Sequence, residues 1–311
     1  MKWKRSKGRK GRDLIDVRGA SGGSGTSSSG SGMSGLPIPG GIAGLGGGAG
    51  VVVLIVVIAI QVFGGGGSAG FDLGPAFGSG AQAPGADDPA PIPAEEDPQR
   101  DLRDFSSYVF TDAQNTWGKI FSEDDDSYER AELVLYDGAV STEGCGGATS
   151  AVGPFYCPAD ERVYLDLSFY ADMERQLDAE GDFAWAYVIA HEIGHHVQNL
   201  TGVNAEVSEL ESSDPDRANE LSVRVELQAD CYSGVWAATV FAQGDLEAGD
   251  LDEAFTASEA VGDDRLQEQA GQNVDPDSFT HGTSEQRRTW FENGYESGDP
   301  SACDTFSPDE V

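Results

Sequence analysis

Residues 182–200 read DFAWAYVIAHEIGHHVQNL and contain the pattern His191-Glu192-Ile193-Gly194-His195. Apolar residues and both histidines of the pattern recur near one side of a helix with 3.6 residues per turn, and Gly202 supplies a C-terminal stop. We therefore expect a helix over residues 182–200. Two imidazoles four positions apart project from one face of a helix and can bind one metal ion together.

Glu192 gives this helix a chemical role beyond metal binding. A zinc ion lowers the pKa of bound water towards about 7, and a carboxylate one position after a ligand lies where it can take the proton. Three of the four histidines of the chain are His191, His195 and His196, so a chance cluster is improbable. The alternative is a structural histidine pair without metal. The pattern predicts one zinc ion per chain and a hydrolytic reaction with Glu192 as the base.

A third ligand is expected on a second helix, because a catalytic zinc site has three protein ligands and one open position. Residues 219–241 favour such a helix, and within it Glu226 and Asp230 lie four positions apart. We expect Glu226 to bind the zinc and Asp230 to accept a hydrogen bond from a ligand imidazole. The alternative is two charges on a solvated helix face, in which case Glu220 or His281 would be the third ligand.

Other polar residues give weaker signals. His281 is a candidate donor of a hydrogen bond to the oxyanion of the transition state, or else a loop histidine before the last helix. His196 points about 100° away from His195 around the helix, so we expect it at the surface or behind the ligands. Tyr187, one turn before His191, is expected in the core rather than in catalysis.

Further elements follow from apolar spacing and turn residues. We expect helices over residues 105–121 and 250–261, and a last helix that Ser284 caps and that runs to Phe291. Residues 132–136 and 162–167 favour strands, and residues 144–158 favour a loop. Together with the two helices described above, these elements predict a helix-rich α+β domain over residues 101–311.

The first third of the chain has a different composition. Residues 1–40 form a basic, Gly/Ser-rich leader, residues 41–63 are apolar enough to cross about 30 Å of hydrocarbon, and residues 64–100 are a Gly/Pro/acidic linker. Basic residues ahead of the apolar segment predict a cytoplasmic N-terminus and a domain outside the membrane. A cleaved signal peptide is the alternative, and it would also export the domain.

Charge and cysteine usage restrict the class of protein further. The formal net charge is -35, although the first 18 residues carry eight basic and two acidic side chains, so the domain repels phosphate backbones and a nucleic-acid partner is not expected. All four cysteines lie in the exported part, where an oxidising compartment favours two disulfides. Of three connectivities, we favour Cys145 with Cys157, which encloses a short Gly/Pro loop, and Cys231 with Cys303; free thiols are the alternative.

Several tracts together resemble the putative neutral zinc metallopeptidases, bacterial proteins with an N-terminal membrane segment and an exported zincin-type domain. The resemblance spans residues 117–295 and rests on GPFYCP (153–158), VYLDL (163–167), GDFA (181–184), AYVIAHEIGHHVQ (186–198), ELQADC (226–231) and HGTSEQR (281–287). It implies zinc on His191, His195 and Glu226, with Glu192 as the base. The Gly/Ser-rich leader and the acidic surface are not part of this pattern.

The sequence as a whole predicts a zincin-like α+β domain behind a single transmembrane helix and flexible linkers. We expect a zinc-dependent endopeptidase that acts on peptides or proteins outside the cytoplasmic membrane, with an edge strand over residues 163–167 that pairs with extended substrate. One rival is a zinc amidase that acts on cell-wall peptides. The other is a binding protein without catalysis in which zinc joins two helices. The sequence leaves the oligomeric state open.

Overall fold

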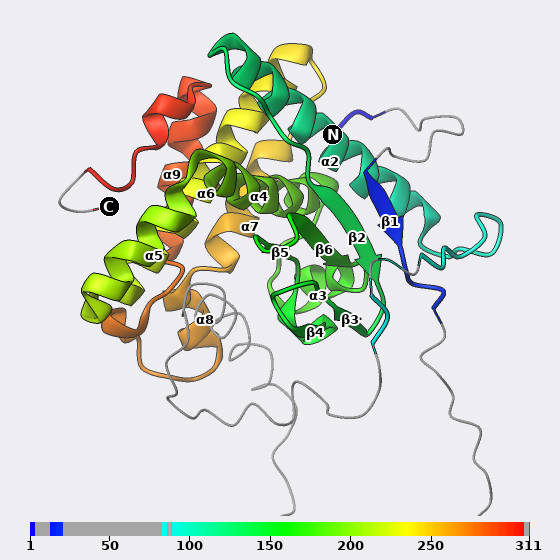
Figure 1. The fold of residues 1–311 in the computed structure, drawn as a ribbon, viewed down its shortest axis with the longest axis horizontal. Coiled ribbons are helices and arrows are strands. Elements are labelled where there is room, and N and C mark those ends of the chain that lie inside the picture. The colour runs from blue at the N-terminus through cyan, green and yellow to red at the C-terminus, as the bar shows by residue number, and fades with distance from the viewer. Residues whose placement is uncertain (4–12, 21–82, 86, 88, 308–310) are drawn as a thin grey trace, which may run out of the picture.

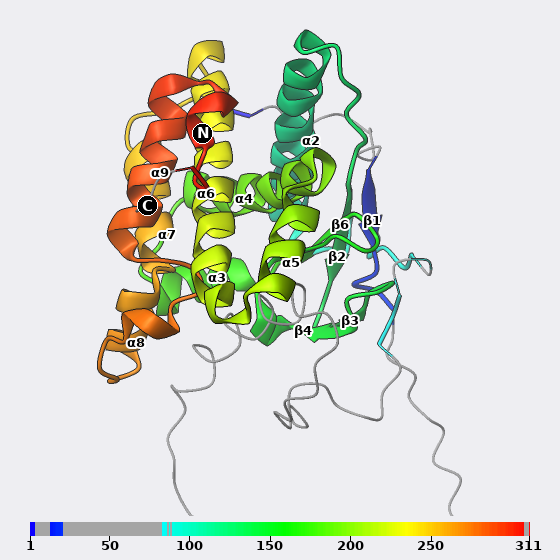
Figure 2. The ribbon, with the colours of Figure 1, turned by 60° about the vertical axis from the view of Figure 1, so that its left-hand side comes forward.

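A layer of helices packs against one face of a small sheet in the computed structural model (Figures 1 and 2). The structure describes residues 1–3, 13–20, 83–85, 87, 89–307 and 311. The sheet contains four strands in the order β1-β2-β6-β5, and a separate hairpin contains β3 and β4. The strands are β1 (Leu14–Asp16), β2 (Glu132–Tyr136), β3 (Ala139–Ser141), β4 (Gly147–Thr149), β5 (Phe155–Cys157) and β6 (Arg162–Asp166).

Strand β5 forms one edge of the sheet, and it runs antiparallel to β6. The remaining strands, β1, β2 and β6, are parallel to one another. The prediction of an edge strand at residues 163–167 is therefore wrong, because β6 lies between β2 and β5. The prediction of a loop over residues 144–158 is also wrong, since β4 and β5 lie within it; these strands are only three residues long and follow glycines that read as turns.

Alternation along β2 gives the sheet two covered faces. Leu133 and Leu135 belong to the large core beneath the helices, whereas Val134 and Tyr136 belong to a second cluster. This second cluster also contains Val140 of β3 and other residues of the hairpin and β5. Successive side chains of a strand point to opposite faces, so β2 has an apolar partner on each side.

The helices confirm most of the predicted segments. They are α2 (Arg100–Glu123), α3 (Phe169–Gln176), α4 (Asp182–Thr201), α5 (Val203–Ser213), α6 (Ala218–Gln243), α7 (Asp250–Ala260), α8 (Asp263–Gln269) and α9 (Ser284–Ser297). Gly202 and Gly244 end α4 and α6 in the left-handed region, with φ of 85° and 77°. Thr283, not Ser284, is the N-cap of α9, where it forms a capping box with Gln286.

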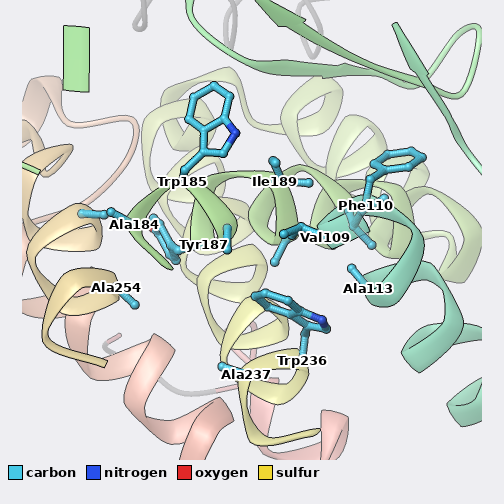
Figure 3. Close-up of a cluster of buried hydrophobic side chains, with 14 of the residues drawn as sticks. Val109, Phe110, Ala113, Ala184, Trp185, Tyr187, Ile189, Trp236, Ala237 and Ala254 are labelled. Atoms are coloured by element: carbon cyan, nitrogen blue, oxygen red, sulfur yellow. The ribbon is translucent and has the colours of Figure 1, made fainter. Parts of the chain in front are cut away.

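Helices α2, α6 and α7 pack around α4 in the core (Figure 3). Val109 and Phe110 of α2 approach it from one side, and Trp236 of α6 and Ala254 of α7 approach from others. Helices α6 and α9 pack so closely that a Cβ on Gly294 would lie 1.9 Å from the backbone oxygen of Cys231. Small residues at this crossing bring the backbones of α6 and α9 together.

Both predicted disulfides are confirmed. Cys145 is bonded to Cys157, which ends β5, and Cys231 of α6 is bonded to Cys303 near the C-terminus. All four cysteines of the chain are thus paired. The two cysteines of the second bond are 72 positions apart in the sequence. This bond joins α6, the helix that carries Glu226, to the segment that follows α9.

Residues near the N-terminus belong to the fold, ahead of the expected domain start at residue 101. Strand β1 pairs with β2, and Arg18 is buried in ion pairs with Asp16 and Asp97 at 2.8 Å each. The backbone N–H of Ala90 donates to the oxygen of Asp16. These contacts could not be predicted from composition, because the leader and the linker each have the composition of an unstructured segment.

The predicted transmembrane segment, residues 41–63, lies outside the described residues. Within the part of the chain that the structure describes, no helix combines the length and the apolar character that a membrane span requires. The expected span therefore stays a prediction.

Candidate metal centre and active site

Helices α4 and α6 cross beside the predicted ligands, and Gly194 lies at the crossing. A Cβ on Gly194 would lie 3.0 Å from both the Cα and the backbone oxygen of Ala229. Glycine leaves space beside its backbone because it has no Cβ atom. In the structure the space is taken by the backbone of α6, and this close approach brings Glu226 to the two histidines.

The three predicted zinc ligands converge on one point. His191 Nε2 lies 3.2 Å from Glu226 Oε2, and His195 Nε2 lies 3.5 Å from Glu226 Oε1. One ligand atom from each of these residues lies within 4.8 Å of the others. Two imidazole nitrogens and one carboxylate are the donor set of a catalytic zinc site with an open position.

Partners on the far side of each imidazole support this assignment. His191 Nδ1 lies 2.9 Å from Asp230 Oδ1, and His195 Nδ1 lies 2.9 Å from Gln198 Oε1. Since both partners are acceptors, each Nδ1 carries the proton, and each Nε2 can offer its lone pair to a metal. The residues present thus fit a zinc ion. Asp230 has the predicted role, whereas Gln198 was assigned none.

Arg287 of α9 neutralises the acidic side of the site, a role that the sequence analysis missed. Its Nε donates to Asp230 Oδ2 at 2.8 Å, and its Nη2 lies 3.7 Å from Glu226 Oε2. Burial by itself would raise the pKa of Asp230, but Arg287 and His191 lower it. The only signal was the position of Arg287 in the last resembling tract.

Tyr187 joins the same network instead of serving only as a core residue. Its hydroxyl donates to Asp230 Oδ1, and Arg287 Nη2 lies 3.3 Å from the hydroxyl oxygen. Tyr187 is also 2 % exposed and packs edge-on against Phe291 of α9. It therefore combines the expected core position with a contact to the residue that orients His191.

Glu192 is buried beside the ligands and contacts the edge strand. Burial raises the pKa of Glu192 to about 7, and the nearby charge of Glu226 adds to the rise. The backbone N–H of Tyr156 in β5 lies near the carboxylate and partly opposes this rise in pKa. A carboxyl group with a pKa near neutrality can accept and return a proton within one reaction cycle.

His281 lies in the cleft with His191 and Glu192, as the oxyanion hypothesis requires. Its Nδ1 lies 3.2 Å from Asp263 Oδ1, and Asp263 Oδ2 accepts the backbone N–H groups of Thr280, His281 and Gly282 at 2.7, 2.6 and 3.1 Å. With an acceptor beside Nδ1, Nε2 is available for the cleft. Asp263 was missed, because an acidic residue 18 positions away gave no signal.

Two other sequence candidates lie away from the ligands. His196 is fully buried and not at the surface, since its Nδ1 contacts the Tyr156 hydroxyl at 3.0 Å and its Nε2 contacts the Glu129 oxygen at 2.8 Å. Glu220 pairs with Arg217 and Arg224 near the surface. Neither residue contributes to the ligand set.

A cleft of about 150 Å³ opens onto these groups. Its lining contains the ligands, Glu192, His281 and Arg287, together with residues of β5, α3 and the end of α7. The lining residues are Val152, Gly153, Pro154, Phe155, Tyr156, Pro158, Phe169, Tyr187, Val188, His191, Glu192, His195, Asn204, Glu226, Val261, His281 and Arg287.

Comparison with known proteins assigns the chain to a family. The model of the putative neutral zinc metallopeptidases matches residues 1–306. The chain belongs to this family. Its membership assigns zinc and peptidase chemistry in general terms, in agreement with the donor set described above.

Relatives of this family member occur in distant bacteria. The uncharacterized protein YpfJ of Escherichia coli K12 is 53% identical over 203 residues, which is 65% of this chain and 70% of the relative. The uncharacterized protein Rv2575 of Mycobacterium tuberculosis is 45% identical over 191 residues, which is 58% of this chain and 64% of the relative. No solved structure matches the chain significantly.

Proposed function

We propose that this chain is a zinc-dependent endopeptidase with one zinc ion on His191, His195 and Glu226. The observation that carries the proposal is the convergence of three ligand atoms within 4.8 Å, next to a buried carboxylate in the same cleft. A zinc ion that only joined two helices would need no Glu192. Its burial beside the ligands therefore favours catalysis over the binding-protein rival.

The side chains divide the reaction among them. Zinc, when bound, supplies a Lewis acid that polarises the scissile carbonyl and makes water more acidic. Glu192 takes a proton from the attacking water and delivers it to the leaving amine. His281, whose Nδ1 is paired with Asp263, would donate a hydrogen bond from Nε2 in its imidazolium form, in which both ring nitrogens are donors, to the carbonyl oxygen as negative charge develops there. Asp230 and Gln198 keep His191 and His195 in the orientation that binding requires.

Strand β5 is the element that we propose for substrate binding, in place of residues 163–167. It is the terminal strand of the sheet, and Phe155 and Tyr156 line the cleft. An extended peptide can add to the exposed edge of a sheet through main-chain hydrogen bonds. Tyr156 of this strand and Glu192, the proposed general base, line the same cleft, which supports this assignment.

We further propose that the domain acts outside the cytoplasmic membrane, which the two disulfides favour because they persist in oxidising compartments. An anchor at residues 41–63 would hold it at the membrane. Strand β1 restricts the topology, however. Residues 13–20 pair with the domain, whereas a single span at residues 41–63 would leave these residues and the domain on opposite sides of the membrane, so the pairing and the single span exclude each other within one chain.

The test of the proposed activity is the Glu192→Gln variant of the full chain. We expect zinc content near one per chain and loss of hydrolysis of an unstructured protein such as casein, because the base contacts water and not the metal. Glu161→Gln, which changes an acidic residue that does not line the cleft, is the matched control and should keep full activity. Activity of Glu192→Gln within tenfold of wild type would contradict the assignment.

A further inference from the structure

Two apolar walls border the metal ligands in the cleft. Val152, Pro154 and Phe155 precede or begin β5, and Phe169 of α3 stands behind them. Gly153, at φ 75°, keeps this wall tight, since a Cβ there would lie 3.4 Å from the Phe169 ring.

A second apolar wall comes from two helices. Val188 lies three positions before His191 on α4, and Val261 ends α7. Both are partly buried against the main core and line the cleft. The backbone oxygen of Val261 accepts a hydrogen bond from Arg287 Nη1 at 3.4 Å, which ties this wall to the charged network of the site.

The histidines and the arginine that line the cleft already have acidic partners. His191 and His195 face Glu226, His281 faces Asp263, and Arg287 faces Asp230. Arg287 is the one lysine or arginine among the lining residues, and Asp230 occupies two of its nitrogens. The described lining therefore offers no unpaired cation for a carboxylate of a substrate.

We infer that the substrates are unstructured peptides with a bulky apolar side chain on a residue that flanks the scissile bond. This inference rests on the proposed peptidase function and names its substrate class. One methylene group in an apolar pocket changes kcat/KM by about tenfold or more. A charged side chain at the same place loses its hydration and finds no partner, so it is excluded.

The same argument separates proteolysis from the cell-wall amidase reading. Peptides of the cell wall are small, and they carry carboxylates. Apart from the zinc ion itself, they would meet no unpaired lysine or arginine in the described lining, on a chain with a net charge of -35. Val188 and Val261 are the residues we assign to specificity, because both are apolar and line the cleft, and Val188 lies on the same helix as His191 and His195.

The first experiment uses the zinc-loaded full chain and a series of twelve-residue Gly/Ser peptides that contain a single Leu. We expect cleavage at a bond next to the Leu, and we expect the cleaved bond to move when the Leu moves, as mass spectrometry would show. Replacement of the Leu by Ala should lower kcat/KM at least tenfold, and Asp should lower it further. Equal cleavage of the Leu and Asp peptides would overturn the inference.

The second experiment replaces an apolar side chain of the cleft, Val188, by an acidic one. Val188→Asp should lower kcat/KM for the Leu peptide at least tenfold, and it should raise kcat/KM for a further peptide in which Lys replaces the Leu. Val274→Asp adds the same charge at a valine that is 41 % exposed and outside the cleft, so it should change neither value. An unchanged order of substrates in Val188→Asp would exclude this residue from specificity.

A binding measurement separates this inference from the proposed reaction. The Glu192→Gln chain keeps the walls but cannot cleave, so calorimetry can compare the intact Leu, Ala and Asp peptides on it. We expect the Leu peptide to bind at least tenfold more tightly than the Ala peptide. If that order holds and the wild type cleaves no peptide, the peptidase proposal fails while the apolar subsite stands. If the wild type cleaves and all three peptides bind equally, the subsite fails alone.

Discussion

Asp230 joins a predicted zinc ligand to a buried arginine. It accepts from His191 Nδ1 on one side and from Arg287 Nε on the other, and it is 0 % exposed. A buried ion pair that loses one partner leaves the other charge without compensation, which costs about 3–5 kcal/mol. Asp230 therefore affects both metal affinity and folding, whereas Glu226 acts mainly on the metal.

This difference predicts that Glu226→Ala has the larger effect on zinc binding and that Asp230→Asn has the larger effect on the free energy of unfolding. Glu226→Ala should lose zinc and activity, because only two imidazoles remain as ligands. Asp230→Asn should weaken zinc binding by about 10 to 100-fold, but it should lower the free energy of unfolding more than Glu226→Ala does. Zinc content after dialysis and urea unfolding of the metal-free protein would measure the two effects.

Glu220→Ala is the matched control for these variants. It removes a carboxylate from the same helix, at a side chain 44% exposed and paired with Arg217 and Arg224. We expect full zinc content. Loss of zinc in Glu220→Ala together with its retention in Glu226→Ala would show that the two-helix donor set is wrong.

His281 and Asp263 provide a second test at the residue scale. His281→Ala should lower kcat by about 100 to 1000-fold, as loss of an oxyanion donor does. Asp263→Asn should lower kcat less, with zinc content and KM near wild type. Because Asp263 acts through His281, the double variant should be no slower than His281→Ala. Additive losses would instead assign Asp263 a structural role.

Helices α6 and α9 depend on two glycines for their close packing. A Cβ atom on Gly234 would lie 2.1 Å from the backbone oxygen of Phe291. A Cβ atom on Gly294 would lie 1.9 Å from the backbone oxygen of Cys231. Glu226 and Asp230 lie on α6, and Arg287 lies on α9, so separation of these helices would pull the charge pair apart. Element packing is in this way linked to the electrostatics of the site.

We predict that Gly294→Ala lowers the free energy of unfolding by about 3 kcal/mol or more, because the added methyl group forces the two backbones apart. The control is Gly118→Ala in α2, where a Cβ would meet nothing nearer than a Tyr128 ring atom at 3.7 Å. This control should stabilise by about 0.5–1 kcal/mol, since alanine favours helices. Urea unfolding curves would compare them, and equal stability of both variants would refute the close-packing argument.

At the scale of the whole molecule, β1 joins a segment near the N-terminus to the sheet of the domain. Val17 is buried among residues of β2, β3 and β5, and Arg18 is enclosed with Asp16 and Asp97. A buried guanidinium with two carboxylates is stable only while the segments that supply them remain together. Residues 13–20 and the metal centre therefore share one compartment in this fold.

The prediction is that two single-cysteine reporters respond alike. Since all four native cysteines form disulfides, Ala20→Cys and Asp137→Cys each add one free thiol. A membrane-impermeant maleimide added to intact cells should label both variants, and permeabilised cells provide the reference. Labelling of Asp137→Cys alone would show that β1 is not paired in the cell and would restore the single-pass topology.

The sequence alone determined the parts that depend on local geometry. His191 and His195 share a face because any helix repeats every 3.6 residues, and Gly202 ends that helix because glycine adopts positive φ at low cost. The strand over residues 132–136 and the helices around residues 182–200 and 219–241 followed from apolar spacing in the same way. These properties need only a few neighbouring residues, so they could be read before the fold was known.

Tertiary structure decided the parts that depend on distant partners. Arg287 neutralises Asp230 across 57 positions, and Asp263 holds His281 across 18. Strand β1 covers β2 from a segment whose composition resembles a linker, and β5 takes the edge position that β6 was expected to hold. Isolated charges and three-residue strands have no stable arrangement of their own. Their roles arise only when folding removes water and brings complementary groups together. The spacing of residues along the sequence does not predict such contacts.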